Sequence, residues 1–340
     1  MKYMQNIEQS GNSMERRWIS IVSDLEGIDG AKKNIKIEIM EDGMPRAMAF
    51  FDIDETLAHL SIIHGPAIRK LFPNVDPTEL EMVYYAGFKL GNSFREFDRM
   101  KGIYEDSQTR WKDPKVYWEE RYLPHAKEID EPGNLAHNIA AGILKAYGEI
   151  AARVADEIYE NDPKQFEKSN IAPIFFLARL YSRLGIPIVG FTANAGILVK
   201  ALAKYLKLSE TFIDIATDEI MQGGGKELAV LALMKKLEFK QGVSVPKDRL
   251  IFVGDSIRGD IGVMIEVQKI DPKIRGTGVL VLKNKAALVQ IKKEINEDRS
   301  LRKIADMIDV HGFVLDEVPL NPKGEPTLLS IHRNKFLEKL

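Results

Sequence analysis

The sequence predicts an α/β protein: a doubly wound, mainly parallel Rossmann-like sheet, interrupted by a large all-helical insert. From about residue 170 onward, short apolar runs alternate with helix-like segments, a pattern typical of parallel sheets with helices on both faces. Between residues 58 and 169 the strand-like runs disappear, and aromatic and charged residues recur at helical spacing. We therefore expect residues 1–57 and 170–340 to form the α/β core and residues 58–169 to form a separate helical domain.

The first strand-like segments precede this insert. Residues 36–53 are predicted to form a β-hairpin, in which "IKIEIM" and "AMAFFDID" flank a turn at "EDGMPR". The second segment is apolar at consecutive positions, as expected for a strand that is covered on both faces. The role of roughly the first 35 residues is not visible in their pattern.

The clearest helix of the insert follows Pro132 and Gly133, with Asn134 as a candidate N-cap. Its apolar residues recur every three or four positions, which predicts an amphipathic helix. This stripe contains Leu135, Ile139, Ile143, Tyr147, Ile150, Val154 and Ile158.

After the insert, the predicted elements follow one another closely. A helix over "NIAPIFFLARLYSRLG" ends at Gly185. The predicted strands are "IPIVGFT", "FIDIAT", "DRLIFVGDS", "TGVLVLK" and "HGFVLDEV". The predicted helices between them are "AGILVKALAKYL", "KELAVLALMKKLEF", "DIGVMIEVQKI" and "KAALVQIKKEI". The tail "PKGEPTLLSIHRNKFLEKL" is interpreted as either a docking helix or a frayed end.

Composition excludes several classes of function. Lys and Arg number 48 against 50 Asp and Glu, so the formal net charge of −2 favours neither nucleic acid nor an anionic membrane as a partner. The absence of cysteine excludes disulfides, thiolate catalysis and cysteine-type zinc sites. No signal-peptide pattern or membrane-spanning apolar run is present. We therefore expect a soluble, cytoplasmic chain.

Polar residues follow three of the buried strands, where the strands of a parallel sheet share one edge. They are Asp52, Asp54 and Thr56 after the first strand, Thr192 and Asn194 after the second, and Asp255 and Asp260 after the third, with Lys226 behind three glycines at a helix start. Several carboxylates at one point repel each other and lose hydration. A hard divalent cation such as Mg²⁺ would remove this repulsion and bridge to a phosphate.

These residue types support phosphoryl transfer. One carboxylate can attack phosphorus. A second carboxylate, two residues further on, can protonate the leaving group and later activate water. Thr192 and Lys226 can hold the phosphoryl oxygens as negative charge develops.

The segments "DIDET", "FTAN", the lysine of "GGGKEL" and "VGDSIRGD" resemble the four ordered motifs of the haloacid dehalogenase (HAD) superfamily. The resemblance covers residues 46–65 and 170–285. It implies that Asp52 is the nucleophile and Asp54 the general acid/base, and that Thr56 shapes the loop between them. It also implies a Mg²⁺ site formed by Asp52, Asp54 through its backbone carbonyl, and Asp255.

The resemblance further implies that Thr192 and Lys226, together with Asp52, bind the phosphate. Asp260 is then either a metal ligand or a hydrogen-bond partner of Lys226. A helical insert after the first motif is a cap in this superfamily, closing over the site and supplying substrate contacts. Candidate contacts, each with packing or solvation as the leading interpretation, are Arg69, Arg95, Arg110, Trp111 and Lys112.

Simpler roles compete for some of these residues. Asp255 and Asp260 can cap the helix that follows them, and Asn194 is interpreted as a helix N-cap. Lys226 can be a solvated residue of a first helical turn, although the helix dipole disfavours a cation there. His59 and His64 follow the first motif closely but show no pairing pattern and receive no role.

The leading hypothesis is a Mg²⁺-dependent phosphatase that hydrolyses a small phosphorylated metabolite through an aspartyl-phosphate. Two alternatives stay open: a phosphotransferase or phosphomutase of the same superfamily, and a non-catalytic protein that binds a phosphate ligand or regulates. A dehalogenase is disfavoured, because the hydrolytic dehalogenases of this superfamily use no metal and lack the second aspartate, here Asp54. A protein-serine phosphatase acting on polymerase tails is suggested by "DETL" but disfavoured by the large insert. The substrate and the oligomeric state are not visible in the sequence.

Overall fold

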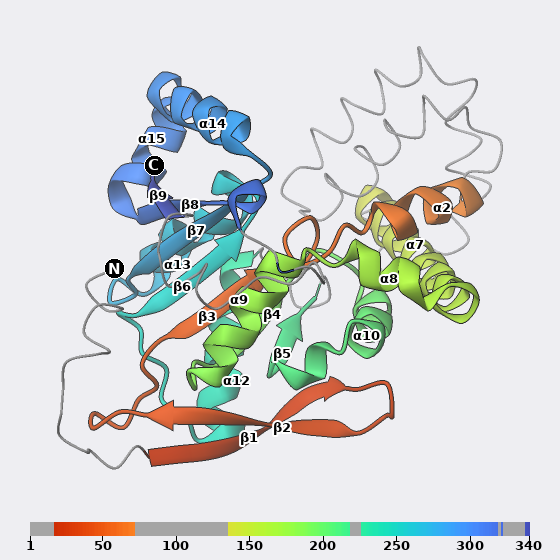
Figure 1. Cartoon of the computed structure of the whole chain (residues 1–340), viewed down its shortest axis with the longest axis horizontal. Coiled ribbons are helices and arrows are strands. Elements are labelled where there is room, and N and C mark those ends of the chain that lie inside the picture. Colours follow the sequence, from red (N-terminus) through yellow and green to blue (C-terminus); the bar gives the residue numbers. More distant parts are fainter. Residues whose placement is uncertain (1–16, 72–134, 218–225, 319–320, 322–336) are drawn as a thin grey trace.

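The computed structural model describes residues 17–71, 135–217, 226–318, 321 and 337–340. A seven-stranded sheet of order β5-β4-β3-β6-β7-β8-β9 forms its centre (Figure 1). The strands are β3 (Met48–Asp52), β4 (Ile188–Phe191), β5 (Asp214–Ala216), β6 (Leu250–Gly254), β7 (Gly276–Leu282), β8 (Asp309–Val314) and β9 (Leu337–Lys339). The strands from β5 to β8 are parallel, and β9 is antiparallel to β8.

The chain starts the sheet at its centre with β3, adds β4 and β5 on one side, and then adds β6, β7 and β8 on the other. This is the order of a Rossmann-like, doubly wound sheet. The predicted fold class is confirmed. The order reverses between β3 and β6, so the crevice of the sheet is expected where these two strands end.

Helices cover both faces of the sheet. They are α9 (Ala172–Arg183), α10 (Gly196–Tyr205), α12 (Lys226–Gln241), α13 (Val263–Ile270), α14 (Lys285–Glu297) and α15 (Arg299–Met307). Ala49 and Phe51 of β3 pack in the cluster formed with α9 and α10. Met48 and Phe50 pack in the cluster formed with α12 and α13. Because alternate side chains of β3 enter two different cores, all five of its residues are buried, which explains why the four residues before Asp52 are apolar.

The predicted hairpin over residues 36–53 is wrong. Strand β2 (Lys32–Ile39) pairs instead with β1 (Arg17–Glu26) in a separate antiparallel sheet, whereas β3 enters the central sheet. The turn between β2 and β3 exists, and Gly43 adopts a φ of +78° in it. Across this turn lies an isolated bridge between Ile39 and Pro45. Because proline has no N–H, Pro45 cannot extend that bridge into a ladder.

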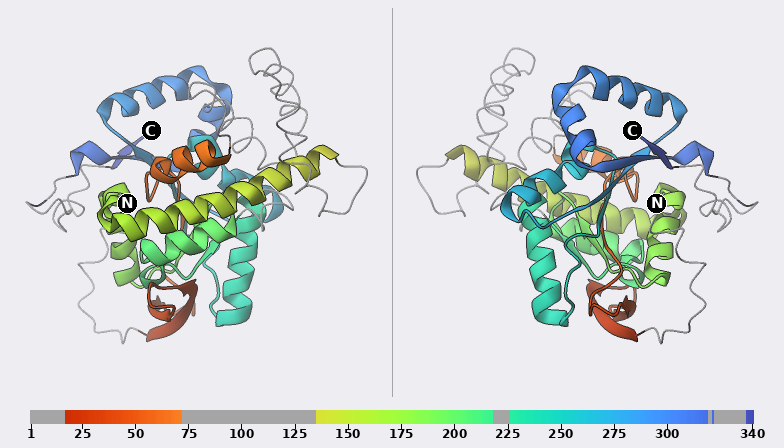
Figure 2. Two further views of the ribbon diagram at one scale, coloured as in Figure 1. Left: turned by 90° about the vertical axis from the view of Figure 1, so that its right-hand side faces the viewer. Right: turned by 90° about the vertical axis from the view of Figure 1, so that its left-hand side faces the viewer.

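The described part of the insert (residues 58–169) contains α2 (Ser61–Leu71), α7 (Leu135–Asn161) and α8 (Pro163–Ser169). Helix α7 runs across α2 and α10 (Figure 2). Tyr147 and Val154 of the predicted apolar stripe are buried there. Asn134 and four of the candidate contacts, Arg95, Arg110, Trp111 and Lys112, lie outside the described residues.

The two chain crossings between core and insert lie side by side. Ala58 and Asn170 form an isolated antiparallel bridge. On either side of it, the His59 N–H donates to the Ser169 carbonyl and the Ile171 N–H to the Leu57 carbonyl, each at 2.8 Å. The predicted domain boundaries, 57/58 and 169/170, coincide with this paired crossing. The division into two domains stays a prediction, because α7 packs closely on α10 of the core.

The C-terminal region adds one helix and one strand that the sequence analysis did not predict. Helix α15 precedes β8, and residues Leu337–Lys339 form the edge strand β9. Both interpretations of the tail, a docking helix and a frayed end, are therefore wrong for residues 337–339, whereas residues 322–336 of the tail lie outside the described residues. Within the described residues, no helix combines the length and the apolar character needed to cross a membrane.

Candidate active site

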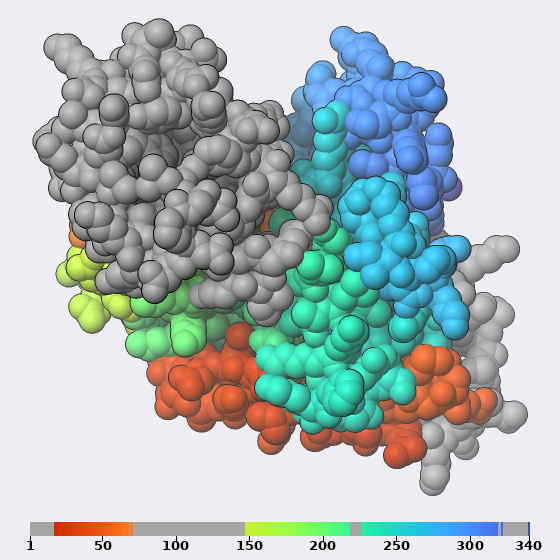
Figure 3. Space-filling model, turned by 180° about the vertical axis from the view of Figure 1, so that it is seen from behind, coloured from red at the N-terminus to blue at the C-terminus, as the bar shows by residue number. Residues whose placement is uncertain are grey.

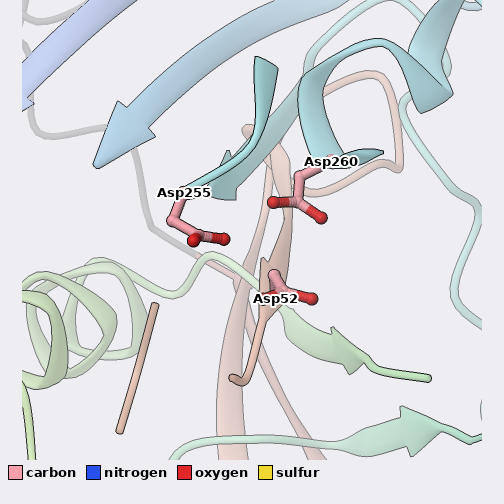
Figure 4. A group of neighbouring side chains, drawn as sticks. All are labelled: Asp52, Asp255 and Asp260. Atoms are coloured by element: carbon pink, nitrogen blue, oxygen red, sulfur yellow. The ribbon is translucent and has the colours of Figure 1, made fainter. Parts of the chain in front are cut away.

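Three carboxylates converge where the order of the sheet reverses. Asp52 ends β3, and Asp255 and Asp260 follow β6, the neighbouring strand. One oxygen of each carboxylate lies within 4.8 Å of the others. Figure 4 shows the three side chains turned toward a common centre. Asp52 is 5% exposed and Asp260 2% exposed, so little water screens their charges.

Lys226 joins two of these carboxylates. It is the first residue of α12, and its Nζ donates to Asp52 Oδ1 at 3.1 Å and to Asp260 Oδ1 at 2.6 Å. The same Nζ lies 4.9 Å from the ring centroid of Phe191, in cation–π geometry. The solvated role considered for Lys226 is therefore wrong, because the ammonium group is bound at the site.

Asp260 is fixed by its own loop. The π-helical turn Ile257–Ile261 carries it, and its Oδ2 accepts the Ser256 N–H at 2.9 Å. A Cβ at Gly254 would lie 2.3 Å from the Asp260 Cβ, so only glycine permits this approach. Since Lys226 takes the other oxygen, Asp260 is engaged as the hydrogen-bond partner of the lysine, one of the two roles left open by the sequence.

Charge is not balanced at this cluster. Burial, followed by the negative charges of Asp260 and Asp255, raises the pKa of Asp52 well above its usual value, although Lys226 opposes this shift. Burial and the charges of Asp260 and Asp54 raise the pKa of Asp255 to about 7. Burial alone would lower the pKa of Lys226, but the Asp52 and Asp260 carboxylates raise it instead. With three ionised carboxylates and one lysine, the cluster has an excess of negative charge, which a further cation could neutralise.

The donor set fits Mg²⁺. All the available groups are carboxylate oxygens, the ligands that this hard cation prefers. Both oxygens of Asp260 already accept hydrogen bonds. Asp52 and Asp255 are therefore the side chains that remain for a metal ion.

Asp54 has a different environment, although it lies two residues from Asp52. Its Oδ2 is 3.1 Å from Nε2 of His64, and its Oδ1 is buried without a hydrogen-bond partner among the described residues. The turn that carries it contains Glu55 in a left-handed conformation with a φ of +56°. Thr56 in this turn is fully buried, and its hydroxyl has no partner in the described part of the chain. Its role in shaping the loop stays a prediction.

Thr192 lies on the adjacent strand end. Asp52 pairs in register with Phe191, so Thr192 is one residue beyond that pair. Its Oγ1 accepts the side-chain amide of Asn194 at 2.9 Å, which leaves the hydroxyl proton available for donation. The N-cap role predicted for Asn194 is wrong: Ala195 holds that position, and Asn194 binds Thr192 instead. No described hydrogen bond joins Thr192 to Asp52 or Lys226.

The sequence analysis missed two side chains near the site, His64 and Tyr147. His64 was noted but received no role, and Tyr147 was assigned only to the apolar stripe. The tyrosine hydroxyl contacts Nδ1 of His64, 83 residues away in the chain. No local sequence signal reveals such a contact.

No protein-family model and no curated protein matches the sequence. The structure is similar to solved structures at low sequence identity. YfnB from Bacillus subtilis, named as a HAD-hydrolase and bound to magnesium, is 15% identical, with 69% of this chain and 89% of YfnB covered and a TM-score of 0.40. CbbY from Rhodobacter sphaeroides, in complex with phosphate, is 19% identical, with 69% and 86% covered and a TM-score of 0.39.

A 2-haloacid dehalogenase from Pseudomonas syringae is 12% identical, with 69% of this chain and 86% of that chain covered and a TM-score of 0.36. In the present chain, the first and fourth motifs end neighbouring parallel strands, and the motif lysine binds an aspartate of each. The second motif follows the strand on the other side of β3. The segments that resemble the superfamily motifs are thus gathered at the switch point of one doubly wound sheet.

Proposed function

We propose that this protein is a Mg²⁺-dependent phosphatase that hydrolyses a small phosphorylated metabolite. The observation that carries the proposal is the buried Asp52, held on one oxygen by Lys226 and flanked by two further carboxylates at the switch point of the sheet. A carboxylate in this position is well placed to be a nucleophile, because Lys226 fixes it and can also neutralise negative charge on an incoming phosphate.

In this proposal Asp52 and Asp255 hold Mg²⁺ together with the backbone carbonyl of Asp54. The ion would supply positive charge that lets an anionic phosphate approach the buried Asp52 and its neighbouring carboxylates. Lys226 and the hydroxyl of Thr192 hold the phosphoryl oxygens, and Asp260 keeps Lys226 in place.

The reaction then has two steps. Asp52 attacks phosphorus and forms an aspartyl-phosphate, while Asp54 gives its proton to the departing alkoxide. Asp54, now ionised, takes a proton from water, and that water attacks the same phosphorus. Inorganic phosphate leaves, Asp52 is regenerated as a carboxylate and Asp54 as the protonated acid.

The decisive variant is Asp52→Asn. Phosphate release from phosphorylated sugars, amino acids, nucleotides and short acids is measured with Mg²⁺, first for the unchanged protein and then for the variant. We expect Asp52→Asn to release no measurable phosphate and to form no acid-stable phosphoenzyme. Asp214→Asn is the matched control, since Asp214 is also a buried aspartate bound by a lysine of α12.

Turnover at the unchanged rate in Asp52→Asn would refute the proposal. The same panel separates the alternatives. Phosphoryl transfer to an added alcohol in preference to water identifies a phosphotransferase or mutase. Binding of phosphate esters without turnover by the unchanged protein identifies a non-catalytic binding protein.

A further inference from the structure

A chain of hydrogen bonds leads from the partly buried Asp54 into the insert. Asp54 Oδ2 pairs with Nε2 of His64, and Nδ1 of the same ring pairs with the hydroxyl of Tyr147. His64 belongs to α2 and Tyr147 to α7. The two rings are stacked, with their centroids 5.8 Å apart. His64 is only 6% exposed and Tyr147 only 3%. Neither residue belongs to the four motifs.

The two oxygens of Asp54 are therefore not equivalent. Oδ2 is held by His64, whereas Oδ1 is buried without a hydrogen-bond partner among the described residues. A buried carboxylate oxygen without a partner is costly, because it has lost its water and gained nothing in return. Such an oxygen is suited to a partner that arrives later, with the substrate.

We propose that His64 and Tyr147 are positioning residues that orient Asp54 for proton transfer, with Oδ2 anchored and Oδ1 left for the leaving group. This inference rests on the proposed function and deepens it. A carboxylate that is anchored at one oxygen has few orientations when its anchor is itself fixed. The imidazole is fixed because its second nitrogen is bound by Tyr147 and its ring packs on the tyrosine ring. Two helices of the insert thereby set the geometry of a core residue.

Substrates with different leaving groups can distinguish a misoriented Asp54 from a generally damaged fold. An alkoxide needs a proton as it departs, so its loss depends on a well-placed acid. p-Nitrophenolate is stable as an anion and departs without that help. A misoriented Asp54 therefore slows the cleavage of alkyl phosphates selectively, whereas a damaged fold slows both substrates alike. The parameter kcat/KM is the proper readout, because it reports the steps up to the first phosphoryl transfer.

The test compares Tyr147→Phe and His64→Phe with the unchanged protein. The first change removes a hydroxyl and the second removes both ring nitrogens, and each keeps an aromatic ring. We expect kcat/KM for an alkyl phosphate to fall at least about tenfold, and for p-nitrophenyl phosphate less than about threefold. Tyr181→Phe is the matched control: Tyr181 is a buried tyrosine of α9, and it should change neither value. Thermal unfolding of each variant shows whether it is folded.

Equal losses on both substrates, or no loss on the alkyl phosphate, would overturn the inference. If Tyr147→Phe fails to fold, the ratio measured for His64→Phe decides. The proposed function is tested separately. If Asp52→Asn keeps full turnover, both proposals fail, whereas an inactive Asp52→Asn with an unselective Tyr147→Phe removes only the positioning role.

Discussion

Helix α12 carries two lysines that each bridge two aspartates. The two bridges lie at opposite ends of the strands of the central sheet. Lys226 binds Asp52 and Asp260 where the strands end. Lys236 binds Asp214, at the start of β5, and Asp24 of β1. Through this second bridge the helix is tied to the separate two-stranded sheet, and Figure 3 shows this part of the chain, in teal, next to the red N-terminal residues.

The two bridges differ in their charge balance. Burial alone would raise the pKa of Asp24, but the hydrogen bond and charge of Lys236, with Lys240 and Lys32 nearby, bring it below its usual value. At the other bridge the pKa of Asp52 is raised, first by burial and then by the negative charges of Asp260 and Asp255, and Lys226 does not offset this shift. Each bridge consists of one lysine and two aspartates. At the Lys236 bridge the positive charges nearby are sufficient to keep Asp24 ionised, as expected for a structural ion pair. The excess of negative charge at Asp52 is the feature on which the proposed Mg²⁺ site rests.

The largest difference is expected in catalysis. Lys226→Met removes the ammonium group that would hold the phosphoryl oxygens and should lower kcat/KM by about 10²–10³-fold. Lys236→Met makes the same change ten residues later and should leave turnover unaltered. It should cost about 1–3 kcal/mol of unfolding free energy, because it leaves the buried Asp214 without its lysine partner. Steady-state kinetics and urea unfolding of both variants check this, and equal activities would remove the distinction.

The next difference concerns Mg²⁺. If the excess of carboxylates forms a metal site, Mg²⁺ at a hundred times its Kd should stabilise the folded protein by about 2.7 kcal/mol. Asp255→Asn should lose most of this increment, and EDTA should reverse it in the unchanged protein. Asp214→Asn should keep it, since the second bridge has no excess charge. Thermal unfolding with and without Mg²⁺ measures the increment, and a full increment in Asp255→Asn contradicts the assignment.

The smallest effect is expected in the pH dependence of stability without metal. Folded Asp255, with a pKa of about 7, keeps a proton that the unfolded chain releases near pH 3.8. Between these values the folded state binds more protons, so this group makes the free energy of unfolding fall as the pH rises toward about 7. Urea unfolding in EDTA across this range, compared with Asp255→Asn, isolates the contribution. An identical pH profile in the variant would show that Asp255 does not titrate there.

Most of the central sheet could be predicted because its signals are local. The unbroken apolar runs of β3 and β6 and the polar residues after them are visible in sequence, and the parallel topology brings them together. Helix α15 was also detectable, since aspartate is a typical N-cap residue and Asp298 stands just before it. In the structure Asp298 accepts two backbone N–H groups of the first turn. The hairpin prediction failed because the turn at Gly43 joins strands of two different sheets: β2 pairs with β1, and both sides of β3 are occupied by β4 and β6.

The surroundings of Asp54 could not be predicted in this way. His64 and Tyr147 are separated by 83 residues, and their contact depends on how α2 and α7 pack on each other. By contrast, Lys226 was found because its motif has a fixed place in the chain order. The order of motifs along the chain is enough to identify site residues of the α/β core. Site residues contributed by the insert can be identified only from the tertiary structure.

The paired crossing at Ala58 and Asn170 has a consequence for motion. The two segments are hydrogen-bonded to each other on both sides of this bridge. Any rocking of the insert would therefore pivot on the insert side of the bridge, after His59 and before Ser169. Such a swing would carry the imidazole away while the Asp54 backbone stayed with the sheet. The nucleophile and its lysine would not be disturbed. A movement of the insert would therefore change the orientation of Asp54 without a change at Asp52 or Lys226.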